Sequence, residues 1–193
     1  MKVVLAQINP TVGALDANSE KIKEIIREYT SQSDLIIFPE MVLTGYPPQD
    51  LLLDDTFIQQ TQEALDGIVA AVKSTAIIVG TIRKENNNLF NTAAVIQDTA
   101  VITYRDKTHL PTYDVFDEVR YFTPSESVEP VEVSVNGKSV KLGLQICEDL
   151  WDDEYDTKVS KSLCSQGAEL LINISASPDR KSTRLNSSHV LIS

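Results

Sequence analysis

The sequence predicts a layered sandwich of the α/β or α+β class. Runs typical of strands alternate with amphipathic runs typical of helices, and two strand-like runs are joined tightly enough to form a hairpin. Hydrophobic residues make up 42% of the 193 residues, so one domain can bury a core of its own. The chain is hardly long enough for two such domains, and it contains no internal repeat.

The N-terminal part of the chain predicts two strands that flank a helix. Residues 2–8 are a β-rich run closed by the turn-forming cluster "NPTVG". A helix is expected from Asn18 onward, capped by Asn18 or Ser19. Residues 34–40, "DLIIFPE", contain the short continuous apolar run that a strand covered on both faces requires. The apolar face of the expected helix comprises Ile22, Ile25, Ile26 and Tyr29.

The remaining chain predicts a loop, two further helices and the other strands. Residues 41–55 are expected to form a loop, because Gly45 and the Pro47-Pro48 pair cannot continue a regular element. A second amphipathic helix is expected over about 56–73, with Ile58, Leu65, Ile68, Val69 and Val72 facing inward. The further expected elements are a strand at 75–82, a hairpin over 91–107 that turns around 97–99, a strand at 139–147, a helix near 156–166 and a strand at 169–175.

Composition narrows the classes of partner and the location. The net charge of −11 argues against nucleic acid or an anionic membrane surface as a partner. Cys147 and Cys164 are too few to indicate a disulfide framework. Neither a signal peptide nor an apolar run of membrane-spanning length is evident, so we expect a cytoplasmic protein.

The character of the sequence changes after residue 178. Residues 179–193 have three basic residues, no acidic residue beyond Asp179, many serines and no clear period. We expect this tail to be disordered or artefactual, because it resembles the translated sequencing-adapter read-through found at the ends of some predicted proteins.

Three reactive side chains stand at the C-terminal ends of apolar runs. Glu40 follows "DLIIFP", Lys107 follows "ITYRD" and Cys147 follows "LGLQI". If these strands are neighbours, the three side chains converge, because strand ends and the loops after them are where sites are assembled. A lysine ammonium about 3–4 Å from the sulfur would favour the thiolate, and a carboxylate could take up and return its proton.

Each of these residues can also be explained by a purely structural role. A lone cysteine at the end of a buried strand is commonly core packing, a Pro-Glu pair commonly forms a solvated turn, and a lysine in a polar loop is commonly a surface charge. Periodicity and composition by themselves leave this choice open.

Three segments carry a resemblance to a known family. "IIFPEMVLTGYPPQDLLL" around Glu40, "YRDKTHLPTYDVFDEVRYF" around Lys107 and "LGLQICEDLW" around Cys147 resemble the nitrilase superfamily of carbon–nitrogen hydrolases. The parts "GYPPQDLL" and "VFDEVRYF" are more particular and resemble the N-terminal glutamine amidohydrolase domain of glutamine-dependent NAD⁺ synthetases. The resemblance runs from residue 1 to about 178, where "LLINISASP" still fits, and then stops.

The resemblance implies a fold and a catalytic triad. The fold would be α+β, a four-layer α-β-β-α nitrilase-type sandwich that is C-terminally incomplete, with residues 1–178 as a truncated glutaminase domain. Missing strands would leave sheet edges uncovered, so we expect the chain alone to fold poorly or aggregate.

By the same resemblance, Glu40, Lys107 and Cys147 would be the catalytic residues. Matching positions suggest further contacts with glutamine from Tyr113, Glu148 and Ser175, a pocket wall from Trp151 and a second carboxylate beside Lys107 from Glu118.

The implied chemistry is glutamine hydrolysis to glutamate and ammonia through a cysteine thioester, without a metal. L-Glutamine would be the substrate, and the ammonia would pass to a synthetase domain that is absent from this chain. ATP, magnesium and deamido-NAD⁺ would bind to that domain, because this chain contains no phosphate-binding glycine motif. The complete enzyme would be a homo-oligomer.

Three alternatives stay open at this point. The chain could be another nitrilase-type amidase that releases ammonia into solution from a different ω-amide. A Cys147–His109 pair is a weaker possibility, because His109 lies two residues beyond Lys107 and adjacent positions on a strand point to opposite faces. The chain could also be a non-catalytic scaffold or an inactive truncated product.

Overall fold

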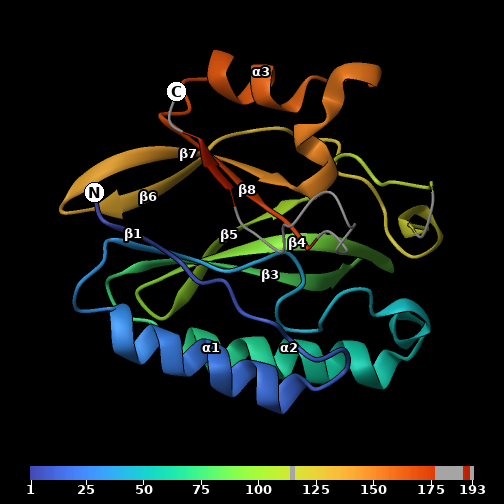
Figure 1. Cartoon of the computed structure of the whole chain (residues 1–193), viewed down its shortest axis with the longest axis horizontal. Coiled ribbons are helices and arrows are strands. Elements are labelled where there is room, and N and C mark those ends of the chain that lie inside the picture. Colours follow the sequence, from blue (N-terminus) through green and yellow to red (C-terminus); the bar gives the residue numbers. More distant parts are fainter. Residues whose placement is uncertain (114–115, 177–188, 192–193) are drawn as a thin grey trace.

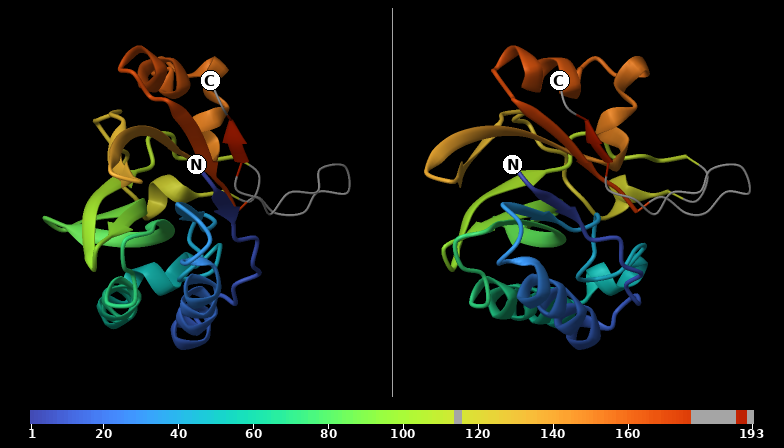
Figure 2. Two further views of the ribbon diagram at one scale, coloured as in Figure 1. Left: turned by 90° about the vertical axis from the view of Figure 1, so that its left-hand side faces the viewer. Right: turned by 60° about the vertical axis from the view of Figure 1, so that its left-hand side comes forward.

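The computed structural model describes residues 1–113, 116–176 and 189–191, which form four layers. One outer layer contains the helices α1 (Leu15–Tyr29) and α2 (Asp55–Val69), and the opposite outer layer contains α3 (Val159–Ser165). Two β-sheets lie between these helical layers, as all three ribbon views show (Figures 1 and 2). The predicted α+β sandwich, with its α-β-β-α order of layers, is therefore confirmed.

The first sheet packs against α1 and α2 and has the strand order β1-β2-β3-β4-β5. β1, β2 and β3 run parallel, and β3, β4 and β5 form antiparallel pairs. β2 and β5 therefore run in the same direction and end at the same edge of the sheet. The strands are β1 (Val3–Leu5), β2 (Leu35–Ile37), β3 (Ala76–Glu85), β4 (Asn88–Gln97) and β5 (Ala100–Asp106).

The continuous apolar run of β2 is explained by burial on both faces. Ile36 packs into the core beneath the helices, whereas Leu35 and Ile37 pack into the core between the two sheets. All three side chains are 0% exposed. The prediction of a doubly covered strand at this position is confirmed.

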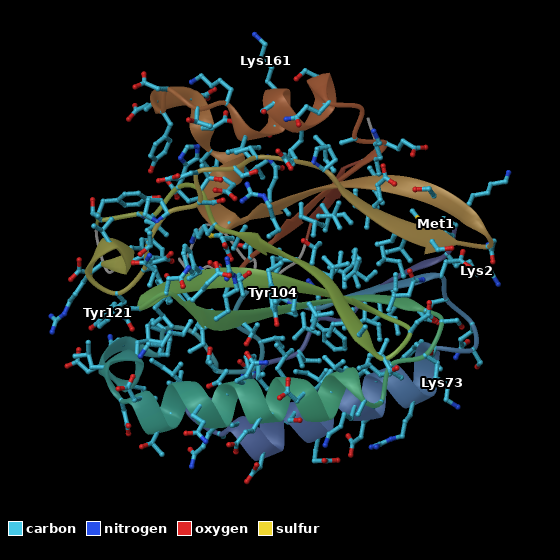
Figure 3. All side chains as sticks on the ribbon, turned by 180° about the vertical axis from the view of Figure 1, so that it is seen from behind. Met1, Lys2, Lys73, Tyr104, Tyr121 and Lys161 are labelled. Carbon is cyan, nitrogen blue, oxygen red and sulfur yellow. The ribbon has the colours of Figure 1, made fainter. Side chains whose placement is uncertain are left out.

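The second sheet has the order β6-β7-β8-β9, in which β7 and β8 are parallel. Its inner face meets the first sheet through Leu144 and Ile172, and α3 covers its outer face with Val159 and Leu163. In Figure 3 side chains fill the space between the layers, and Lys161 points from α3 away from the molecule. The strands are β6 (Val131–Val135), β7 (Lys138–Ile146), β8 (Leu170–Ile174) and β9 (His189–Leu191).

Two hairpin turns go beyond the sequence prediction. The strand β6 was not predicted, although Asn136-Gly137 is a strong hairpin signal, and both residues have positive φ, 52° and 75°. Asn86 and Asn87 also have positive φ and join β3 to β4, so these strands extend beyond the predicted limits of 82 and 91. The predicted turn around 97–99 is confirmed, with Asp98 and Thr99 both at positive φ.

Helix boundaries differ from the predicted ones. α1 begins at Leu15, and its N-cap residue Ala14 makes no side-chain capping hydrogen bond, so the prediction of Asn18 or Ser19 as the cap is wrong. The buried Asn18 amide instead binds the backbone of Thr11 and Leu43. α2 is capped by Asp54 and ends at Val69, before the predicted end at 73. α3 is shorter than the predicted 156–166, because Lys158 before it has an extended backbone and the helix begins only at Val159. The 3₁₀ helix η4 (Asp152–Glu154) is a separate element that precedes the predicted range.

Part of the tail adopts regular structure. His189–Leu191 forms β9 and pairs antiparallel with β8, so these three residues do not fit the expectation of a disordered tail. Residues 177–188 and 192–193 lie outside the described residues, and the proposed artefactual origin of the tail stays a prediction. None of the described helices has the length and apolar character needed to cross a membrane.

Candidate active site

Glu40 lies in a buried turn directly after β2. Its Oε1 accepts hydrogen bonds from Lys107 Nζ at 2.9 Å and from Asn91 Nδ2 at 2.8 Å. Its Oε2 accepts a hydrogen bond from the backbone N–H of Ala176 at 2.9 Å. Because Ala176 follows β8, this last bond joins the turn after β2 to the end of a strand in the other sheet.

Lys107 follows β5 and is fully enclosed. Its ammonium group lies 2.9 Å from Glu40 Oε1 and 2.9 Å from Glu118 Oε1, and the residue is 1% exposed. Burial by itself would lower the pKa of Lys107, but Glu40, Glu118 and then Cys147 hold that pKa well above its ordinary value. The lysine therefore stays positively charged at neutral pH.

Glu118 stands in the 3₁₀ helix η2 (Glu118–Arg120) and supports the lysine from its other side. It accepts a hydrogen bond from Tyr46 Oη at 3.0 Å in addition to the lysine contact. Burial raises the pKa of Glu118 against the opposing effect of Lys107. The structure thus places Glu118 where the sequence analysis expected a second carboxylate.

Cys147 begins the 3₁₀ helix η3 (Cys147–Leu150), immediately after β7. It is a buried non-glycine residue with a φ of 49°, a conformation that L-residues rarely adopt and that concentrates at functional sites. Burial, then the carboxylates Glu40 and Glu118, and to a smaller extent Cys147 raise the pKa of Tyr46. Because Ile146 pairs with Ile174 in the strand register, Cys147 begins η3 beside the end of β8, where the Ala176 N–H binds Glu40 Oε2.

Asp149 ties the loop of Lys107 to the loop of Cys147. Its Oδ1 accepts from the backbone N–H groups of Thr108 at 3.0 Å and His109 at 2.8 Å, and its Oδ2 accepts from the N–H of Ile146 at 3.1 Å. The carboxylate is 0% exposed and lies 3.6 Å from the Arg105 guanidinium. Burial raises the pKa of Asp149, and Arg105 opposes that effect. Glu40, Lys107 and Cys147 thus gather at one edge of the sandwich.

Glu148 forms a second carboxylate site on the outer side of Cys147. Tyr113 Oη donates to its Oε2 at 2.7 Å, and Tyr155 Oη donates to its Oε1 at 3.1 Å. Burial and Glu148 raise the pKa of Tyr155 to about 12, so both hydroxyls remain protonated donors. Tyr113 is 49% exposed, which puts this site at the protein surface.

Residues 2–192 match the carbon-nitrogen hydrolase family. The chain belongs to this family. It is 41% identical to a glutamine-dependent NAD(+) synthetase from Aquifex aeolicus over 179 residues, which cover 92% of this chain and 30% of the relative. The chain therefore spans about a third of the length of the curated relatives it matches.

Solved structures agree with this assignment. A glutamine-dependent NAD+ synthetase from Acinetobacter baumannii superimposes with a TM-score of 0.82 at 32% identity, over 93% of this chain and 33% of that one. An amidase from Nesterenkonia sp. shares the fold with a TM-score of 0.73 at 18% identity, over 91% of this chain and 75% of that one. The resemblance to the nitrilase superfamily is confirmed.

The remaining predicted residues of this carbon-nitrogen hydrolase occupy different environments. Ser175 follows β8, and because Ile146 pairs with Ile174, Ser175 and Cys147 are the first residues after two neighbouring strands. Trp151 is 69% exposed, so an enclosing wall formed by this side chain is not seen among the described residues. His109 stacks on Tyr155 with ring centroids 3.9 Å apart, and its Nε2 lies 3.0 Å from the carbonyl oxygen of Thr157. That contact occupies one of the two ring nitrogens that a Cys147–His109 pair could use.

Sequence reasoning missed three residues of this network, Asn91, Asp149 and Tyr155. Asp149 lies within the motif "LGLQICEDLW" without an assigned role, and Asn91 is the first residue of the predicted hairpin over 91–107. The one available signal was a short polar side chain at a strand end next to a reactive residue. Within the described chain, no cluster of three or more His, Cys, Asp or Glu side chains has the geometry of a metal site.

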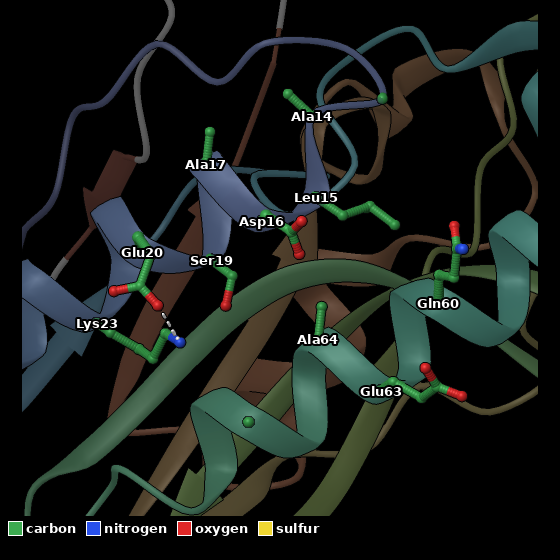
Figure 4. A pocket seen from close by; sticks show the side chains of 12 residues that line it. Ala14, Leu15, Asp16, Ala17, Ser19, Glu20, Lys23, Gln60, Glu63 and Ala64 are labelled. Atoms are coloured by element: carbon green, nitrogen blue, oxygen red, sulfur yellow. Dashed lines mark ion pairs between the residues drawn. The ribbon is translucent and has the colours of Figure 1, made fainter.

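Of two cavities in the structure, one adjoins the candidate site and the other lies away from it. A cavity of about 310 Å³ is lined by Tyr46, Phe116 and Glu118 and so adjoins the buried cluster. A cavity of about 770 Å³ lies between α1 and α2 on the helical side of the first sheet, where Ala64 and Gly67 leave space beside the Glu20–Lys23 ion pair (Figure 4). This second cavity contains none of the predicted site residues.

Gly80 of β3 lets the backbone of Glu40 approach closely, so we expect Gly80→Ala to impair the site. A Cβ at this position would lie 2.6 Å from Glu40 Cα and 2.6 Å from Met41 N, so the turn after β2 would have to move. Displacing a catalytic group by about 1 Å can reduce the rate about 10²-fold. Steady-state amide hydrolysis by the variant would measure this loss.

Gly67→Ala is the matched control for this prediction. A Cβ on Gly67 in α2 would meet nothing within 4 Å, and alanine favours a helix over glycine by about 0.5–1 kcal/mol. The control should therefore be slightly more stable and fully active. A Gly80→Ala variant with the activity of the control would contradict the close-approach argument.

Proposed function

We propose that this domain hydrolyses the side-chain amide of L-glutamine to glutamate and ammonia. The observation that carries the proposal is the buried Glu40–Lys107–Glu118 cluster beside a cysteine held at positive φ. A base, a fixed positive charge and a nucleophile are the groups that covalent amide hydrolysis requires.

In the proposed mechanism Glu40 accepts the Cys147 proton as the sulfur attacks the carboxamide carbon. Lys107 and the backbone N–H of Glu148 stabilise the oxyanion of the tetrahedral intermediate, a contribution worth about 10²–10³ in rate per donor. Glu40 then returns the proton to the departing nitrogen, which leaves as ammonia while the thioester forms. Glu40 next takes a proton from water, which attacks the thioester, and the thiol is reprotonated as glutamate departs.

Glutamine recognition is assigned to the site around Glu148. A carboxylate fixed by two tyrosine hydroxyls is suited to an α-ammonium group, because the hydroxyls hold its orientation while its negative charge attracts the cation. Ser175 would contact the glutamine backbone, and Trp151 would form part of a wall once substrate is bound. The names of the curated relatives, glutamine-dependent NAD(+) synthetases, support glutamine as the substrate.

The wider function follows from these relatives and is part of the same proposal. Ammonia from this domain would supply a synthetase domain that binds ATP, magnesium and deamido-NAD⁺, within a homo-oligomeric enzyme. The amidase domain itself would need no metal or cofactor. A reducing cytoplasm would suit the free thiols of Cys147 and Cys164.

A thiol-directed glutamine analogue, such as a chloroketone, tests the proposal, with labelled residues mapped by peptide mass spectrometry. We expect covalent labelling of the buried Cys147, while the exposed Cys164 serves as an internal control. Free L-glutamine should protect Cys147, and the protein should release ammonia from L-glutamine. Protection and turnover with a different ω-amide would instead assign another amidase activity, and equal labelling of both cysteines would indicate an inactive product.

A further inference from the structure

Asn91 of β4 contacts three members of the buried cluster. Its Nδ2 donates to Glu40 Oε1 at 2.8 Å and, at the longer distance of 3.4 Å, to Glu118 Oε2. Its backbone carbonyl accepts a hydrogen bond from the N–H of Lys107 at 2.9 Å. Asn91 is only 1% exposed, so it is a buried residue that is hydrogen-bonded to both carboxylates and to the lysine backbone.

The orientation of the Asn91 amide follows from these contacts. Both neighbouring carboxylates are hydrogen-bond acceptors when ionised, so the NH₂ group has to face them and the carbonyl oxygen has to face away. That oxygen, Oδ1, is buried and has no hydrogen-bond partner among the residues that the structure describes. An unpaired buried acceptor is unfavourable, so the favourable part of the arrangement is donation to the carboxylates.

The two oxygens of Glu40 are consequently not equivalent. Oε1 receives two donors, Lys107 Nζ and Asn91 Nδ2, which match its two lone pairs. Oε2 receives the backbone N–H of Ala176, which accounts for one of its lone pairs. Oε2 is therefore the oxygen with capacity for a further proton.

We propose that Asn91 is a positioning residue that, together with Lys107, holds Glu40 Oε1 so that Oε2 carries out the proton transfers. This inference rests on the proposed amide hydrolysis. The Cys147 S–H bond breaks and its proton moves to Oε2 as the S–C bond forms. The same proton passes from Oε2 to the nitrogen as the C–N bond breaks, and Oε2 then receives a proton from the attacking water.

Charge around Glu40 determines the sign of the expected pH effect. The groups that face it are Lys107 after β5, Glu118 of η2, Tyr46 of the loop before η1 (Gln49–Leu53) and Cys147 of η3. Removing the Asn91 donor takes away a hydrogen bond to the ionised Glu118, whose pKa burial already raises, so Glu118 binds a proton more readily and supports Lys107 less well. The acidic limb of the kcat/KM profile should therefore move to higher pH.

The experiment compares Asn91→Ala and Asn91→Asp with the control Gln97→Ala in the full chain. Gln97 lies on the same strand, has a buried amide that donates to the carbonyls of Ser74 and Ser134, and belongs to no part of the site. We expect Asn91→Ala to lower kcat about 10- to 100-fold and to shift the acidic limb upward by about one pH unit. Gln97→Ala should leave the acidic limb in place while it lowers the thermal midpoint.

The aspartate variant separates positioning from packing. Aspartate has nearly the volume of asparagine, so a packing role predicts that it preserves more activity than alanine. A third carboxyl group next to Glu40 predicts the opposite, with Asn91→Asp less active than Asn91→Ala near neutral pH. The alanine profile decides the matter if the aspartate variant fails to fold.

If the wild-type chain hydrolyses the amide but the acidic limb of the kcat/KM profile of Asn91→Ala is not shifted, the inference is overturned while the proposed function stays intact. A wild-type chain that releases ammonia from no amide would instead contradict the proposed function.

Discussion

Glu40→Gln is expected to abolish amide hydrolysis while the fold remains intact. Glutamine can keep an acceptor toward Lys107 and Asn91 but places an NH₂ group against the Ala176 N–H, and it cannot take up the Cys147 proton. Loss of a general base commonly costs about 10²–10⁴ in rate, and this base acts in both halves of the proposed reaction. Ammonia release under saturating glutamine measures the loss.

The folded state should survive this change because Lys107 keeps Glu118 as a partner at 2.9 Å. A thermal unfolding curve close to that of the wild type is therefore expected. Glu132→Gln provides a matched control, since Glu132 also faces a lysine but lies on the exposed face of β6, 3.9 Å from Lys141. Turnover by Glu40→Gln at the level of this control would refute the role of Glu40 as base.

Asp149→Ala is expected to give the largest loss of stability. The change removes the acceptor of three backbone N–H groups and leaves the Arg105 guanidinium buried without its carboxylate. Breaking a buried charge pair by removing one partner costs about 3–5 kcal/mol. Urea unfolding, compared at the midpoint with the wild type, measures this difference.

The same substitution should also reduce kcat, because the loops that carry Lys107 and Cys147 are no longer joined. Asp153→Ala is the control, an exposed carboxylate in the following 3₁₀ helix whose loss should change stability by less than about 0.5 kcal/mol. Asp149→Asn should lie between the two, because its amide oxygen can still accept from Thr108 and His109. Equal stability of Asp149→Ala and Asp153→Ala would show that the hydrogen bonds of Asp149 between the two loops do not stabilise the fold.

The sandwich was predictable because its layers are encoded locally. The apolar run of 35–38 has the pattern of a doubly covered strand, and the apolar positions of α1 and α2 repeat with the helical period. The positions where elements begin were less predictable. Asn18 has the composition of a helix cap, yet its amide binds Thr11 and Leu43, because burial against the loop after Glu40 outweighs the local preference.

The candidate site was predictable only where a residue type is chemically distinctive. Glu40, Lys107 and Cys147 stand out at strand ends, and the surrounding motifs drew attention to Glu118 and Glu148. Asn91 and Tyr155 gave no comparable signal, because an asparagine in a strand and a tyrosine in an acidic loop are common. Their importance comes from a carboxylate that lies 51 residues away from Asn91 and from one that lies 7 residues away from Tyr155.

The sequence by itself determined the layered architecture, the order of the main elements and the three reactive residue types, since hydrophobic periodicity and side-chain chemistry are properties of short segments. The tertiary structure decided which oxygen of Glu40 is occupied, how Asp149 joins two loops and where Trp151 lies. Those properties depend on distances between groups from separate strands, and such distances are fixed by strand register and by the packing of one sheet on the other.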